Sequence, residues 1–233
     1  MRMALLMFML IGTATAASAE PQGIVAGHLR AIGQKRIFFG HQSVGANIIE
    51  GLRDLAREHG VELAIRGEDT SAEGPVFVDA RVGENTRPRS KIEAFARKMN
   101  DGWAERSDIA FFKFCYVDFD AETDVQALFD EYLRTHEDLK RRHPGVTFVH
   151  VTVPLTITQT GLKGWIKNAI GKGAWGEREN VRRHHFNELL RARFSGKEPI
   201  FDLARVESTT PDGRPHGFED RKSTRLNSSH LGI

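Results

Sequence analysis

A serine lies at the point where a short apolar run gives way to a helical pattern. The run is Ile37-Phe38-Phe39, and Gly40 ends it. Beyond it, apolar residues recur at helical spacing, namely Val44, Ile48, Ile49, Leu52 and Leu55. Ser43 therefore stands at the predicted start of a helix, where unpaired N–H groups stabilise negative charge. Two interpretations are open: Ser43 is a nucleophile, or it is an N-cap residue, a position that serine favours.

Further polar residues follow the other predicted strands. The loop 79–86 contains Gly83 and Asn85, Tyr116 and Asp118 come after the third strand, and 153–156 follow the fourth. In a parallel sheet these loops meet at the carboxyl edge of the strands, where ligands bind. A nucleophile and the donors that stabilise its oxyanion come from separate loops, so this convergence favours a catalytic site.

The elements that must position these residues alternate along the chain. We expect strands at 37–39, 61–65, 109–114, 146–151 and 199–203, with helices between most of them and a long connection from about 67 to 83. Alternation of this kind implies right-handed crossovers between parallel strands. The predicted fold class is therefore α/β, a three-layer α/β/α sandwich with a flavodoxin-like five-stranded parallel sheet.

The order of these elements and their motifs resembles the SGNH/GDSL hydrolase superfamily. Phe39-Gly-His-Gln-Ser43-Val-Gly45 is similar to the block that carries the family's nucleophile, with His-Gln in place of its aspartate. Gly83 is the counterpart of the oxyanion glycine. Where the family has Gly-x-Asn-Asp, this chain has Cys115-Tyr-Val-Asp118, so Asn85 or Tyr116 would have to replace the missing asparagine donor.

The resemblance implies a serine esterase that works through an acyl-enzyme on Ser43. The N–H groups of Ser43 and Gly83, with Asn85, would bind the oxyanion. The residues expected to line the site are His41, Gln42, Tyr116, Asp118 and Trp165. No metal or organic cofactor is required. The expected partner is a small-molecule or polysaccharide ester, with acylated carbohydrate or cell-envelope material favoured.

The family's Asp-x-x-His motif is not found before Glu219. His216 lies among glycine and proline residues, which favours a turn, and His41 is too close to Ser43 in sequence to face it readily. We therefore expect the catalytic histidine to be encoded downstream of this sequence. The alternative is a non-catalytic carbohydrate- or ligand-binding module on the same fold, and an intact genomic copy would distinguish the two.

Both ends of the chain differ from the domain between them. Residues 1–19 have an early arginine, an apolar run and an Ala-Ser-Ala terminus, the pattern of a cleavable signal peptide. This segment is too short for a membrane anchor, so we expect a periplasmic or secreted protein. Residues 220–233 resemble a translated sequencing adaptor, which leaves 20–219 as the hydrolase-like domain. The two ends hold four basic residues and one acidic residue, so the domain retains 29 basic and 30 acidic residues, a balance that gives no support to nucleic-acid binding.

Three further features allow a structural and a functional interpretation. Cys115, the single cysteine, lies in an apolar run, which favours a packed thiol over a nucleophile. The cluster Arg182-Arg183-His184-His185 is best explained as solvated helix surface, and its spacing does not suit a metal. The segment 154–176, with Trp165 and Trp175 among glycines, is either a mobile wall of the site or a short packed helix.

Overall fold

The computed structural model describes residues 19–71, 73–156 and 176–209. Its centre is a five-stranded sheet in the order β2-β3-β1-β4-β5, and every pair of neighbouring strands is parallel. The strands are β1 (Arg36–His41), β2 (Ile65–Gly67), β3 (Val76–Arg81), β4 (Ile109–Phe112) and β5 (Thr147–Phe148). The central strand is β1, which places the residues that follow it in the middle of the carboxyl edge.

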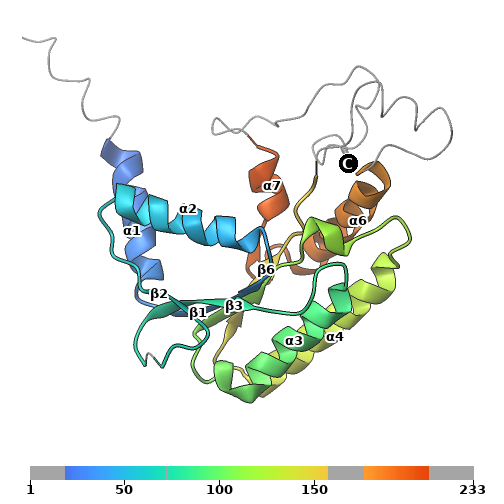
Figure 1. Ribbon diagram of the computed structural model, residues 1–233, viewed down its shortest axis with the longest axis horizontal. Coiled ribbons are helices and arrows are strands. Elements are labelled where there is room, and N and C mark those ends of the chain that lie inside the picture. Colours follow the sequence, from blue (N-terminus) through green and yellow to red (C-terminus); the bar gives the residue numbers. More distant parts are fainter. Residues whose placement is uncertain (1–18, 72, 157–175, 210–233) are drawn as a thin grey trace, which may run out of the picture.

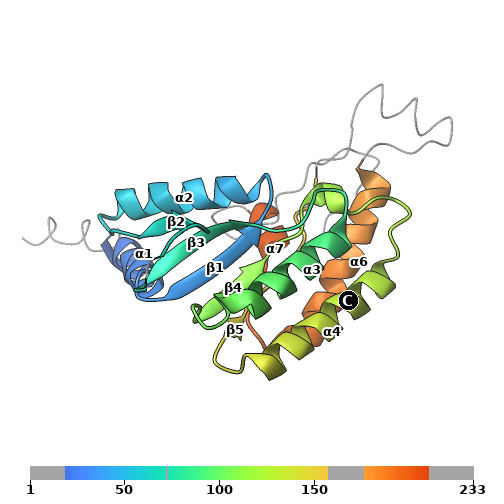
Figure 2. The ribbon, with the colours of Figure 1, turned by 60° about the horizontal axis from the view of Figure 1, so that its bottom comes forward.

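Helices cover both faces of this sheet, which confirms the predicted three-layer α/β/α architecture (Figures 1 and 2). One face carries α1 (Ala19–Ile32) and α2 (Gly45–Glu58). The other carries α3 (Pro88–Lys98), α4 (Val125–Arg142) and α6 (Glu177–Phe194). Beyond β5, the short strands β6 (His150–Val151) and β7 (Ile200–Phe201) form a separate parallel pair, and α7 (Leu203–Glu207) follows.

The central strand packs on both faces, which explains its continuous apolar run. Phe39 points toward α2 and packs in a cluster with Ile49 and Ile65. Phe38 points the other way, into the larger core beneath α3 and α4, where it meets Phe95. Burial on both sides holds β1 firmly, so the turn that follows it starts from a fixed position.

Two strand predictions were wrong in detail. Of the segment 61–65 only Ile65 is in a strand, the edge strand β2. Between β2 and β1 lies β3, in the segment that we expected to be a connection. The strand expected at 199–203 is shorter and pairs with β6 rather than with the main sheet. Among the described helices, none is long and apolar enough to cross a membrane.

Candidate functional site

The turn after β1 presents Ser43 in a strained conformation. Gly45 N donates to Gln42 O at 3.1 Å, and Ser43 between them has a φ of 46°, in the left-handed region. For a residue with a side chain this conformation costs about 1 to 2 kcal/mol. The N-cap of α2 is Val44, without a side-chain bond, so Ser43 does not cap the helix. The Ser43 side chain is exposed, and its hydroxyl makes no hydrogen bond within the described ranges.

His41 supports this turn from below. Its Nε2 bonds to Asp79 Oδ1 at 2.7 Å, and burial lowers its pKa while the bond to Asp79 opposes that shift. Its Nδ1 is buried and has no partner in the part of the chain that the structure describes. A Cβ on Gly45 would lie 2.2 Å from His41 Cγ, so the ring is covered by the start of α2. His41, which we expected to line the site, is instead buried under the start of α2.

The loop after β3 is bonded to the turn that holds Ser43. Gln42 Nε2 donates to Gly83 O at 2.7 Å, which joins the loops that follow two neighbouring strands. Gly83 has a φ of 58°, and a Cβ there would lie 2.6 Å from the Lys91 backbone, so this position requires glycine. The Gly83 N–H makes no hydrogen bond to any other residue that the structure describes, which leaves it available to a ligand.

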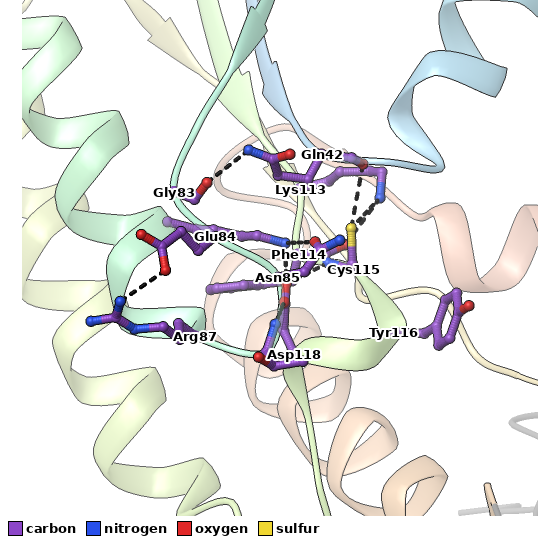
Figure 3. A network of polar contacts seen from close by, with 12 residues as sticks. Gln42, Gly83, Glu84, Asn85, Arg87, Lys113, Phe114, Cys115, Tyr116 and Asp118 are labelled. Atoms are coloured by element: carbon purple, nitrogen blue, oxygen red, sulfur yellow. Dashed lines mark hydrogen bonds and ion pairs between the residues drawn. The ribbon is translucent and has the colours of Figure 1, made fainter.

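Beneath this loop lies a buried ion pair, and Figure 3 shows its carboxylate, Asp118, within the polar network. Lys91 Nζ lies 2.5 Å from Asp118 Oδ2 and 3.0 Å from Asn85 Oδ1. The side chains of Lys91 and Asp118 are both 0% exposed. Asp118 therefore lies under the site rather than lining it, whereas the side chain of Asn85 is exposed at its surface.

A second lysine is buried at the end of β4, next to the single cysteine. Lys113 Nζ donates to Phe114 O at 3.3 Å and to Cys115 Sγ at 3.5 Å, and burial lowers the pKa of this amine. The Cys115 thiol donates to Gln42 O at 3.4 Å. Cys115 is thus confirmed as a buried thiol, and it supports the turn after β1.

Arg183 is buried, which corrects the prediction that its cluster is solvated surface. Its Nε donates to Tyr116 O at 2.8 Å and its Nη1 to Thr156 Oγ1 at 3.0 Å. It therefore ties α6 to two strand-end segments. The Tyr116 side chain points away from the network around Asn85 (Figure 3), and the Arg183 guanidinium lies over its ring, 5.9 Å from the centroid.

These contacts link Gln42, Gly83, Asn85 and Asp118, and Ser43 follows Gln42 in the turn. Trp165, His216, most of the segment 154–176, residues 1–18 and the adaptor-like tail lie outside the described residues. Sequence reasoning missed Lys91, although its spacing of four from the buried Phe95 places it on the inner face of α3.

The described residues include no group of histidine, cysteine or acidic side chains that could hold a metal ion. Comparison with known proteins gives no match, neither to a protein-family model nor to a curated sequence.

Proposed function

We propose that this chain is a serine ester hydrolase in which Ser43 becomes acylated. The observation that carries the proposal is the exposed Ser43, held in a left-handed turn at the carboxyl end of the central strand without a capping bond. Strain of this kind is concentrated at functional sites, because the surrounding fold must offset its cost. The hydroxyl oxygen would attack the ester carbonyl and expel the alcohol, and water would then release the acid and restore Ser43.

Three donors are available for the negative charge that develops on the carbonyl oxygen. The N–H groups of Ser43 and Gly83 make no hydrogen bonds among the described residues, and Asn85 is exposed two residues after Gly83 in the same loop. Donors fixed before the reaction stabilise the tetrahedral intermediate without a cost of reorganisation.

The reaction also requires a base that takes the Ser43 proton. His41 does not fill this role, because both of its ring nitrogens are turned toward other groups, Asp79 and the start of α2. The family resemblance expects the histidine after the last strand, and the described residues that follow β7, 202–209, contain none. We therefore expect the base to come from chain beyond Thr209.

The predicted signal peptide favours a substrate outside the cytoplasm, in the periplasm or the medium. Acylated carbohydrate or envelope material is the substrate class that we propose, with no cofactor.

Labelling with a fluorophosphonate probe tests the proposal in the full-length protein. The probe should modify Ser43, and Ser43→Ala should abolish labelling while the free energy of unfolding changes by less than about 0.5 kcal/mol. Ser90→Ala is the matched control, because the Ser90 hydroxyl bonds only to backbone groups, Glu84 N and Arg87 O. This variant should keep its labelling and lose about 1 kcal/mol of stability.

Labelling that survives Ser43→Ala would refute the assignment of the nucleophile. If the intact protein is not labelled at all but binds a glycan, the non-catalytic alternative is the correct one.

A further inference from the structure

Lys91 is fully buried, and its position calls for an explanation other than stability. An ammonium group taken out of water must be paired and hydrogen-bonded. Lys91 has a charged partner, Asp118, and a neutral one, Asn85. A buried ion pair often contributes no more to stability than apolar residues of the same size. The pair therefore acts chiefly by fixing the positions of the groups that it contacts.

Asp118 fixes the lysine by joining two loops. Its Oδ2 accepts from Cys115 N at 2.6 Å as well as from Lys91, and its Oδ1 accepts from Thr86 N at 2.9 Å. Thr86 follows β3 and Cys115 follows β4, so one carboxylate sets the position of both loops. Because the donors come from the backbone, the carboxylate has little freedom to move.

The bond from Lys91 then determines how the Asn85 amide is turned. A lysine ammonium can only donate, so the amide oxygen of Asn85 must face it and the NH₂ group must point away. Asn85 is exposed, and its Nδ2 has no hydrogen-bond partner among the described residues. The result is an N–H donor that is anchored from below and open to solvent.

We propose that Lys91, held by Asp118, is a positioning residue that orients Asn85 to donate an N–H to the oxyanion formed at Ser43. This inference rests on the proposed function and adds the device that prepares one of its donors. The Lys91 backbone also packs directly against Gly83, so one residue supports two of the three donors. An asparagine without this anchor would have to be ordered during the reaction, which lowers the rate.

Steady-state hydrolysis of p-nitrophenyl acetate by the full-length protein tests the inference. Asn85→Ala should lower kcat by about 10²- to 10³-fold. Lys91→Met keeps most of the length of the side chain but removes the donor, and it should lower kcat at least about tenfold with KM nearly unchanged. In the double variant, Lys91→Met should add little to the loss caused by Asn85→Ala, since both changes remove the same interaction.

Two further variants separate positioning from general damage. Lys98→Met removes another lysine of α3, one that bonds to Glu68 and not to Asn85, and it should retain kcat. If Lys91→Met alone does not fold, Asn85→Asp replaces it, because its carboxylate still accepts from Lys91 Nζ but has no N–H to donate, and kcat should fall as far as in Asn85→Ala.

The inference is wrong if folded Lys91→Met or Asn85→Asp keeps the wild-type kcat, if the losses multiply in the double variant, or if Lys98→Met loses as much. Its failure differs from that of the proposed function. Turnover that persists in Ser43→Ala overturns the proposed function and the inference together, whereas Ser43-dependent turnover with unchanged kcat in Lys91→Met overturns the inference alone.

Discussion

Replacing His136 with phenylalanine should remove part of the acid sensitivity of the folded protein. His136 lies on α4 with 1% of its surface exposed, among aromatic rings that include Phe95 and Tyr132. Its Nδ1 bonds to the Tyr132 carbonyl, and its Nε2 has no partner in the described chain. Burial, reinforced by the nearby His150, lowers the pKa of His136 from 6.5 to about 3.

The size of the effect follows from this pKa. The unfolded chain binds a proton at position 136 below about pH 6.5, whereas the folded protein does not until about pH 3. The neutral histidine thus contributes full stability above pH 6.5, and this contribution is lost as the pH falls toward 3. Each unit of difference between the pKa values of the folded and unfolded states is worth about 1.4 kcal/mol. The free energy of unfolding of the wild type should therefore fall by about 2 kcal/mol through His136 between pH 7.5 and pH 5.

Urea unfolding followed by tryptophan fluorescence at pH 7.5, 6 and 5 measures this loss. His136→Phe should match the wild type within about 1 kcal/mol at pH 7.5 and should lose about 2 kcal/mol less by pH 5. Some acid sensitivity should remain, because burial also lowers the pKa of His150. His28→Gln, an exposed change on α1, is the control and should follow the wild type. If His136→Phe loses as much stability as the wild type between pH 7.5 and pH 5, this reasoning is refuted.

Three glycine substitutions should separate close packing from backbone strain. Gly45→Ala should lower the free energy of unfolding by about 2 to 3 kcal/mol, because its Cβ would collide with the His41 ring. Gly51→Ala, in the same helix with open space around it, should instead raise it by about 0.5 to 1 kcal/mol. Gly83→Ala combines a positive φ with contact against Lys91, and it should cost about 3 kcal/mol and impair turnover. The midpoints of urea unfolding test all three predictions, and midpoints equal to that of the wild type would contradict them.

The fold class could be predicted because both faces of β1 are apolar. The strand β3, which the sequence pattern did not predict, shows the limit of such patterns. Val76, Val78 and Ala80 alternate on its inner face, but Asp79 and Arg81 make the segment resemble a polar loop that follows Gly74-Pro75. The carboxylate of Asp79 is accommodated in a strand because it binds His41 of the neighbouring strand. That contact joins residues 38 apart and leaves no trace in the local pattern.

The same distinction applies to the site. The position of Ser43 between a strand and a helix could be predicted, because the two patterns meet at it. Its left-handed conformation could not, since that conformation is normally expected at glycine. Lys91 could be placed on the inner face of α3 by its spacing from Phe95, but its partner Asp118 lies 27 residues away. Arg183 was misassigned because its charged neighbours are typical of an exposed helix, although its own side chain points inward.

The strand order also has a consequence for how this protein reaches its native state. The partners of β1 are distant in the chain: Arg36 pairs with Val76, and Ile37 pairs with Ile109. Such non-local pairing slows folding, because loop closure must precede the contacts that stabilise it. Asp118 can join the loops after β3 and β4 only when both strands are in register with β1. We therefore expect the arrangement around Ser43 to be a late product of folding, formed after secondary structure and collapse.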